Sequence, residues 1–354
     1  MQGNSKSPEA MHVAMVAPPY FSIPPEAYGG IEEVVGDLTR ALIARGHRVT
    51  LVGAGRDRTP AKFLRTYDEP PTDQLGEPLP ELHHAAAAAQ LLADLDVDVI
   101  HDHTLAGPLT AASRPAPTVA TMHGPMDGEL GDYFRQLGTT VSLVAISDAQ
   151  RALAPDLSWV ATVRNGIDVA SFPFQQAKED WVLFVGRFNP DKAPHLAIDA
   201  AQAAGRRIVL AGKLNEAAEE EYFETAIRPR LGPTVDYVGE VDATAKRELY
   251  AKAACLLFPV QWPEPFGMVM IEAMACGTPV VALDGGSVPE VVVDGTTGII
   301  CATAEDLPAA IAKAGQRRPE ACRAHVEQHF DLTHMAEGYE RVYRRLSGTD
   351  PAAT

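Results

Sequence analysis

The chain carries two successive series of short, almost wholly apolar segments, and helix-forming residues separate each segment from the next. The first series occupies residues 12–18, 47–53, 96–101, 118–123, 141–147 and 159–165, and the second occupies residues 181–186, 206–212, 234–239, 254–260 and 278–283. Strands that are apolar along their whole length are typical of a parallel sheet covered by helices on both faces. The alternation therefore predicts an α/β fold with two doubly wound parallel sheets.

The length of 354 residues suits two domains of ordinary size. We expect the boundary after the first series, so that residues 1–170 form an N-terminal domain and residues 171–332 form a C-terminal domain. Within the first domain, residues 54–82 contain five prolines and are expected to form a long irregular loop. The last periodic segment, residues 333–346, reads as an amphipathic helix.

The charge of the chain limits its partners. The formal net charge is −17, and an acidic surface repels phosphate backbones, so that nucleic acid is not expected as a partner. The first ten residues are polar, and no apolar run approaches the roughly 18 residues of a membrane-spanning helix. We therefore expect a cytoplasmic protein without an integral membrane segment. The four cysteines form no Cys-x-x-Cys pair and are expected to be reduced core residues.

The most informative motif is the string EPFGMVMIEAMACGTP, which begins at Glu264. Gly267 is predicted to open a helix, whose first N–H groups and dipole favour an anion such as a diphosphate. Glu264 precedes this helix and Glu272 lies within it, so that one carboxylate can reach a sugar and the other a ribose. The alternative is that Glu264 caps the helix and Glu272 is a solvated helix residue.

This string resembles the E-x7-E signature of family 4 glycosyltransferases, which are retaining enzymes of the GT-B fold with a cleft between two Rossmann-like domains. Further segments resemble other motifs of the family in the same order, and together they cover nearly the whole chain. These segments are residues 28–31 (YGGI), 119–124 (VATMHG), 145–150 (AISDAQ), 164–168 (RNGID) and 185–194 (VGRFNPDKAP). The chain departs from the family pattern at Ala193 and Pro194, which stand where a glycine is usual.

The resemblance implies that the N-terminal domain binds the acceptor and that the C-terminal domain binds a nucleotide-sugar donor. It also implies that the final helix, residues 333–348, crosses back to the N-terminal domain. The implied catalytic residues are His123, Arg187, Lys192 and Glu264. The implied donor-binding residues are Gly29, Gly30, Gly186, Arg187, Lys192, Gly239, Val241, Glu264, Phe266, Gly267, Met268, Val269 and Glu272.

The residue types at these positions suit a diphosphate leaving group. Arg187 and Lys192 directly follow a buried strand, and their charge can stabilise the negative charge that grows as the glycosidic bond breaks. Gly29 and Gly30 open the first helix without Cβ atoms, so that the backbone can approach a ligand closely. Because these groups supply the positive charge, we expect neither a metal ion nor another cofactor.

The predicted activity is the transfer of a hexose from a nucleotide diphosphate sugar, with UDP favoured over GDP, to an acceptor that the sequence does not identify. His101 and His103 end a strand, but they are expected to point to opposite faces, which is poor geometry for chelating a metal. Two alternatives remain, a GT-B nucleotide-sugar epimerase and a non-catalytic protein that binds nucleotides or carbohydrates. The oligomeric state is open.

Overall fold

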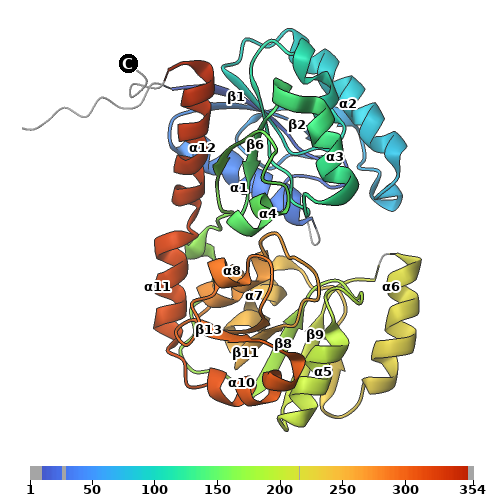
Figure 1. Ribbon diagram of the computed structural model, residues 1–354, viewed down its shortest axis with the longest axis vertical. Helices are drawn as coiled ribbons and strands as arrows, with labels where there is room; N and C mark the ends of the chain where they lie inside the picture. The colour runs from blue at the N-terminus through green and yellow to red at the C-terminus, as the bar shows by residue number, and fades with distance from the viewer. Residues whose placement is uncertain (1–9, 26–28, 215, 350–354) are drawn as a thin grey trace, which may run out of the picture.

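The computed structural model describes residues 10–25, 29–214 and 216–349. In these residues the strands form two sheets, and every strand pairing within them is parallel. Figure 1 shows the sheets in two separate units, one above the other, each covered by helices. The prediction of two doubly wound α/β units is confirmed.

The first sheet has seven strands in the described part of the chain, in the order β3-β2-β1-β4-β5-β6-β7. We call this part of the fold the seven-stranded unit. Its strands are β1 (His12–Val16), β2 (Arg48–Ala54), β3 (Lys62–Tyr67), β4 (Val99–Asp102), β5 (Thr118–Ala120), β6 (Ser142–Ala145) and β7 (Trp159–Thr162). Its main helices are α1 (Gly30–Ala44), α2 (Pro78–Ala93), α3 (Gly128–Leu137) and α4 (Asp148–Leu153).

The second sheet has six strands in the described residues, in the order β10-β9-β8-β11-β12-β13, and defines the six-stranded unit. Its strands are β8 (Trp181–Val185), β9 (Arg207–Ala211), β10 (Val235–Tyr237), β11 (Cys255–Phe258), β12 (Val280–Leu283) and β13 (Gly298–Cys301). Its helices are α5 (Pro194–Ala203), α6 (Ala217–Tyr222), α7 (Ala243–Lys252), α8 (Met268–Ala275), α9 (Val288–Val291), α10 (Leu307–Ala314) and α11 (Pro319–His329). Both sheets reverse their strand order beside the first strand, where ligands of open α/β sheets bind.

The loop predicted for residues 54–82 is partly wrong. β3 pairs with β2 inside this segment, the 3₁₀ turn Thr72–Gln74 follows, and α2 already begins at Pro78. β3 is an edge strand whose residues are half-buried or exposed, so that its sequence KFLRTY lacks the apolar run that marks the inner strands. Both prolines of α2, Pro78 and Pro80, stand in its first turn, where a residue needs no N–H group for the helix.

The final helix, α12 (Leu332–Ser347), packs against the seven-stranded unit although it follows the six-stranded unit in the chain. Figure 1 shows α11 and α12 in succession along one side of the molecule. Tyr339 and Tyr343 are buried in the core of the seven-stranded unit, and the Tyr343 hydroxyl lies 2.6 Å from His101 Nδ1. Glu340 accepts hydrogen bonds from Arg45, with 3.0 Å between Oε2 and Nη2, and so ties α12 to the end of α1.

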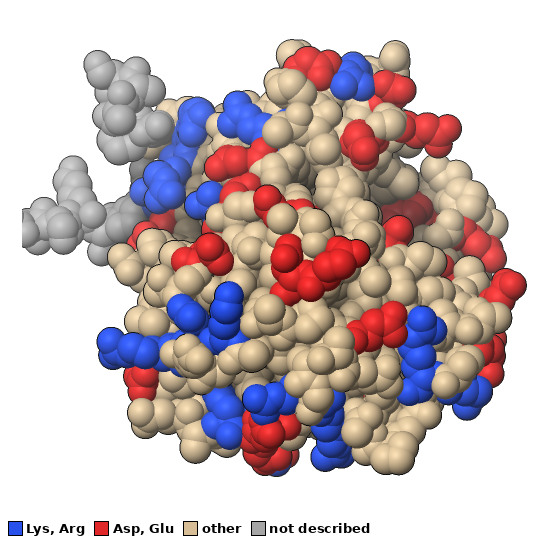
Figure 2. Space-filling model, turned by 60° about the horizontal axis from the view of Figure 1, so that its bottom comes forward, with Lys and Arg blue, Asp and Glu red and all other residues tan. Residues whose placement is uncertain are grey.

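The acidic composition of the chain is visible on its surface. Figure 2 shows Asp and Glu side chains spread over one face, some of them on the walls of a hollow, while Lys and Arg side chains occupy separate groups. On this face the described residues form no continuous basic surface that would suit a nucleic-acid backbone. None of the helices in the described ranges combines the length and the apolar character that crossing a bilayer requires.

Candidate active site

A cavity of about 170 Å³ lies between the two units and opens to solvent. The seven-stranded unit contributes Gly29, Gly30 and Glu33 at the start of α1, and the six-stranded unit contributes the other lining residues. The sequence-predicted residues that line this first cavity are Gly29, Gly30, Gly186, Arg187, Val241, Met268, Val269 and Glu272.

Two adjacent strands, β8 and β9, end at the first cavity and form part of its wall. Gly186 follows β8 and Gly212 follows β9, and both glycines line the first cavity at the carboxyl ends of their strands. A Cβ atom on Gly212 would lie 1.9 Å from the carbonyl oxygen of Gly186, and Gly212 has a φ of 155°. Only glycine allows these two loops to approach so closely, so that the floor of the cavity is made largely of backbone.

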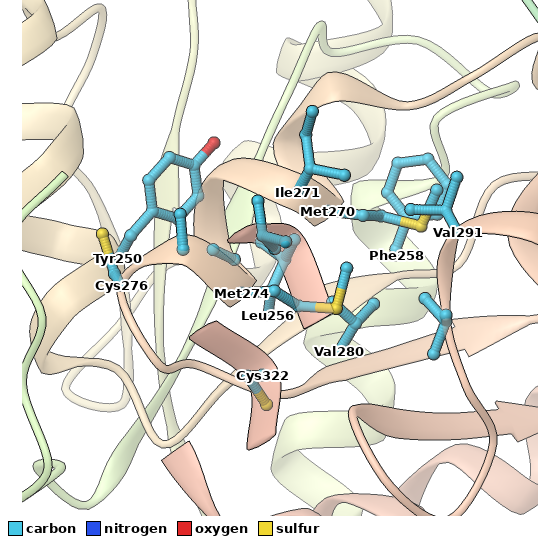
Figure 3. Packing of buried hydrophobic residues seen from close by; sticks show 14 of the residues in the cluster. Tyr250, Leu256, Phe258, Met270, Ile271, Met274, Cys276, Val280, Val291 and Cys322 are labelled. Atoms are coloured by element: carbon cyan, nitrogen blue, oxygen red, sulfur yellow. The ribbon is translucent and has the colours of Figure 1, made fainter. Parts of the chain in front are cut away.

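The N-terminus of α8 lies at the same cavity, since Met268 and Val269 line it. Gly267 begins the helix with a φ of 79°, and a Cβ atom there would lie 2.6 Å from the end of the Met270 side chain. The helix is anchored in the largest core cluster of the six-stranded unit, as Figure 3 shows for Met270 and Met274. A buried, fixed helix can present its first N–H groups to an anion without rearrangement.

Glu272 lies on the buried side of α8, and its carboxylate has two partners from α7. Lys246 Nζ lies 3.0 Å from Oε1, and the Tyr250 hydroxyl donates a hydrogen bond of 2.8 Å to Oε2. Glu33 of the seven-stranded unit lies 3.9 Å from Lys246 Nζ. Burial alone would lower the pKa of Lys246, but the charges of Glu272 and Glu33 outweigh it and raise that pKa.

Lys246, Tyr250 and Glu33 were not among the predicted site residues. The spacing of Lys246 and Tyr250 places them one turn apart on α7, which a helical reading of the sequence could have revealed. Their contact with Glu272 depends on the packing of α7 against α8, which sequence spacing does not show. The alternative interpretation, that Glu272 is a solvated helix residue, is excluded, because this residue is only 3% exposed.

Arg187 lines the first cavity and is held by two carboxylates that the sequence reasoning missed. Its Nε lies 2.5 Å from Glu219 Oε1, and its Nη2 pairs with Glu216. Glu219 is buried at the first turn of α6, whereas the Glu216 side chain is half exposed. The buried partner fixes the orientation of the guanidinium, and the exposed partner can be displaced at lower cost by a ligand.

Lys192 and Glu264 form an ion pair that does not line the first cavity. Trp262 supports this pair, since its indole N–H donates a hydrogen bond of 2.7 Å to Glu264 Oε2 and its ring lies 4.8 Å from Lys192 Nζ. The backbone of Glu264 is fixed as well, because the Ser287 N–H donates a hydrogen bond of 2.9 Å to its carbonyl. Glu264 does not cap α8, whose N-cap is Gly267 and receives no side-chain hydrogen bond.

His123 lines a second cavity, of about 450 Å³, which shares Gly29, Gly30 and Arg187 with the first. Its Nε2 lies 3.0 Å from His103 Nδ1. Burial lowers the pKa of His123 to about 4, so that the ring is neutral at physiological pH. A neutral imidazole can still donate or accept one hydrogen bond at its remaining nitrogen.

The prediction that His101 and His103 point to opposite faces is wrong. Their ring centroids are 4.1 Å apart. β4 ends at Asp102, so His103 lies beyond the regular alternation of the strand. His101 is bound to Tyr343 and, with 2.9 Å from its Nε2, to Thr121. In the described part of the chain no group of three or more His, Cys, Asp or Glu residues could hold a metal ion.

Five predicted donor-binding residues line neither cavity: Lys192, Gly239, Glu264, Phe266 and Gly267. Gly239 has a φ of 76° and its carbonyl accepts a hydrogen bond of 2.9 Å from the Gly212 N–H, so it supports the wall rather than forming it. Phe266 is 2% exposed and belongs to the core under α8. Tyr28, the first residue of the predicted glycine segment, lies outside the described residues.

Comparison with known proteins identifies the family. The family model described as Glycosyltransferase Family 4 matches residues 28–171, and the model described as Glycosyl transferases group 1 matches residues 170–328. The chain is 30% identical to the alpha-maltose-1-phosphate synthase of Mycolicibacterium smegmatis, over 95% of this chain and 100% of that protein. It is 28% identical to the glycogen synthase of Mycobacterium tuberculosis, over 94% of each.

Solved structures agree with this assignment. AviGT4, a glycosyltransferase involved in avilamycin A biosynthesis, matches with a TM-score of 0.76 and 27% identity over 96% of this chain and 99% of its own. HepE of Anabaena, solved in complex with UDP-glucose, matches with a TM-score of 0.75 and 19% identity over 95% of this chain and 100% of its own, which shows the shared fold. The chain belongs to glycosyltransferase family 4 and is a GT-B glycosyltransferase that transfers a sugar from a nucleotide-sugar donor.

Proposed function

We propose that this enzyme transfers a hexose from a UDP-sugar, with a GDP-sugar as the second choice, and that it retains the anomeric configuration of the donor. The observation that carries the proposal is the first cavity, where the N-terminus of α8, the guanidinium of Arg187 and the buried carboxylate of Glu272 meet. An anion site and a hydroxyl acceptor side by side suit a nucleoside diphosphate.

In this arrangement the diphosphate lies between the first turn of α8 and the Gly29-Gly30 segment, and Arg187 binds its oxygens. The phosphate displaces the exposed Glu216 from Arg187, while the buried Glu219 continues to orient the guanidinium. The ribose hydroxyls donate hydrogen bonds to Glu272, whose two oxygens have accepting capacity beyond Lys246 and Tyr250. The base lies toward Val241, beyond β9 and β10.

Catalysis rests on the stabilisation of the leaving group. As the bond between the sugar C1 and the phosphate oxygen breaks, negative charge grows on the diphosphate, and in this proposal Arg187 and the N–H groups of α8 stabilise it. Lys192, which lies outside the first cavity, adds a further positive charge. The acceptor hydroxyl attacks C1 from the same face, and its proton passes to the departing phosphate oxygen. His123 and Glu264 bind hydroxyls of the transferred sugar and hold C1 in place.

The preference for UDP is supported by the match to HepE, whose structures contain UDP and UDP-glucose. The match to a phosphatidyl-myo-inositol mannosyltransferase keeps other hexoses among the possible donor sugars. The donor is identified by thermal shift of the purified protein with UDP, GDP, ADP and TDP. We expect the largest stabilisation with UDP, since ligand that binds only the folded state raises its stability. A larger stabilisation by another nucleotide would replace UDP in the proposal.

Retention can be tested without knowing the acceptor, because water can take its place. Proton NMR of the sugar released from UDP-α-glucose should show the α anomer first, before mutarotation. The appearance of the β anomer first would mean inversion. The appearance of a sugar with altered configuration at C2 would indicate an epimerase instead of a transferase.

A further inference from the structure

The second cavity has an acidic wall. Glu32, Glu81 and Glu216 line it, and among the described lining residues Arg187 is the one lysine or arginine. Arg187 is already paired with Glu216 within this cavity. Lys213, whose charge acts on Glu32, lines the first cavity instead. Even when Glu32 is protonated, Glu81 and Glu216 outnumber Arg187 in the second cavity, which disfavours the binding of an anion there.

The same cavity contains a polar atom without a partner among the described residues. His103 is 3% exposed, and no described residue forms a hydrogen bond with its Nε2, whereas its Nδ1 lies 3.0 Å from His123 Nε2. Burial lowers the pKa of His103 far below its ordinary value, so this ring is neutral. A hydroxyl can donate to such a nitrogen or accept from it, and a buried polar atom without a partner costs free energy until one arrives.

The carboxyl of Glu32 also favours a hydroxyl as the ligand. Burial raises the pKa of Glu32 to about 8, and the neighbouring Glu81 contributes to this shift. The carboxyl is therefore protonated near neutral pH and can donate a hydrogen bond to a hydroxyl oxygen. Burial raises the pKa of Glu81 as well, and its Oε2 accepts a long hydrogen bond of 3.5 Å from the Ala106 N–H. Neither group offers charge complementarity to a phosphate.

The mouth of the second cavity is apolar. Leu75 and Leu105 line it and are 38% and 49% exposed. Further exposed leucines lie on α2, namely Leu79 and Leu82, and on the 3₁₀ segment Gly107–Ser113, namely Leu109, and this segment contacts α2. We call Leu75, Leu79, Leu82, Leu105 and Leu109 the leucine rim. Exposed apolar side chains beside a ligand cavity suit contact with an apolar body.

We propose that the acceptor is an uncharged molecule in which a hydroxyl-bearing head enters the second cavity and an apolar body lies on the leucine rim, and that acceptors phosphorylated on that head are excluded. This inference rests on the proposed transfer reaction, in which the acceptor hydroxyl attacks beside His123. It adds the chemical class of the acceptor, which the reaction alone leaves open.

The test is the affinity of matched probes for the full-length protein saturated with UDP. Octyl glucoside carries an uncharged head and an apolar chain, methyl glucoside lacks the chain, and octyl glucoside 6-phosphate carries a charged head. Calorimetry should give the tightest binding for octyl glucoside and at least about tenfold weaker binding for each of the other two. Equal or tighter binding of the phosphorylated probe, or no binding of octyl glucoside, would overturn the proposal.

Three variants assign the effect to the cavity and its rim. Glu81→Gln removes the carboxylate and keeps the shape of the side chain. It should reduce the ratio between the affinities of octyl glucoside and octyl glucoside 6-phosphate by about threefold or more. Asp68→Asn removes a charge from a fully solvated side chain and should leave it unchanged. Leu105→Ser should weaken octyl glucoside but not methyl glucoside. An equal effect of Glu81→Gln and Asp68→Asn, or no effect of Leu105→Ser, would contradict the placement.

The failure of this inference can be distinguished from the failure of the proposed function. Binding of UDP and its release from UDP-glucose in water need neither an acceptor nor the leucine rim, none of whose residues lines the first cavity. A protein that binds UDP and hydrolyses UDP-glucose but prefers the phosphorylated probe refutes the acceptor class only. A protein that does neither refutes the proposed function itself.

Discussion

Lys246 and Glu272 form an ion pair at the wall of the first cavity, with 3.0 Å between Nζ and Oε1, and the Glu272 side chain is only 3% exposed. Removing the cation with Lys246→Met leaves a buried carboxylate supported by Tyr250 alone. We expect a loss of about 3 kcal/mol in the free energy of unfolding, the lower end for a broken buried pair, because Lys246 is partly exposed. Urea denaturation measures this loss.

The control for this prediction is Lys252→Met on the same helix. Lys252 pairs with Glu248 at the surface, and both side chains are well exposed. Its removal should cost about 1 kcal/mol or less. Equal losses of free energy of unfolding in the two variants would show that the ion pair of Lys246 and Glu272 stabilises the fold no more than a surface pair does.

A second prediction concerns the pH dependence of stability. Burial raises the pKa of Glu32 from 4.5 to about 8, so between these values the folded chain holds a proton that the unfolded chain has released. The contribution of Glu32 to the free energy of unfolding therefore decreases as pH rises through this window. Glu32→Gln removes this contribution, so the variant should gain roughly 3–4 kcal/mol in the free energy of unfolding relative to the wild type between pH 5 and pH 8. A difference that stays constant with pH would contradict the assignment.

A third prediction concerns the attachment of α12. Glu340 accepts hydrogen bonds from Arg45 and, at 3.0 Å, from His47 when its Nε2 carries the proton. Glu340→Gln should lower the free energy of unfolding by about 1–3 kcal/mol, as expected for hydrogen bonds to a charged group. Glu337 is the matched control, because it meets the same arginine at 3.4 Å but is 42% exposed. Glu337→Gln should cost about 1 kcal/mol or less, and a cost equal to that of Glu340→Gln would contradict this account.

The parts of the fold that the sequence predicted are those whose signal is local. Inner strands such as β1 and β11 are apolar throughout because both of their faces are covered, and their positions were predicted within a few residues. β3 was not predicted, because an edge strand with one open side needs no apolar run. The packing of α12 was expected only from the family resemblance, since an amphipathic pattern shows that a helix has a partner without showing which one.

In the candidate site, too, the residues with a local sequence signal could be predicted and the contacts made by packing could not. The glycines and the E-x7-E carboxylates could be found because their chain positions, before and inside one helix, carry the chemistry. The partners of the cations could not be found, because Glu219 meets Arg187 and Lys246 meets Glu272 through the packing of separate helices. His103 was misplaced because strand alternation was applied one residue beyond the end of β4.

A fourth prediction concerns metal ions. Sugar transfer should persist in excess EDTA, because Arg187, Lys192 and the N–H groups of α8 are proposed to supply the positive charge at the diphosphate. Arg187→Met should instead lower kcat by about 10²–10³, the usual cost of removing one group that stabilises a leaving charge. Activity that EDTA abolishes and manganese restores would show that a metal ion carries this role.

The central claim, that the first cavity holds the nucleoside diphosphate with Glu272 at the ribose and Glu264 at the sugar, is tested most directly by calorimetric titration of two variants with UDP. Each variant is first checked for folding by its Tm. Glu272→Ala should lose about 1.5–3 kcal/mol of UDP affinity, as expected for hydrogen bonds to a charged group. Glu264→Ala, which lies outside the first cavity, should keep its UDP affinity while its kcat/KM for transfer falls. Loss of UDP affinity in Glu264→Ala but not in Glu272→Ala would reverse the two roles, and unchanged binding and turnover in both would contradict the account.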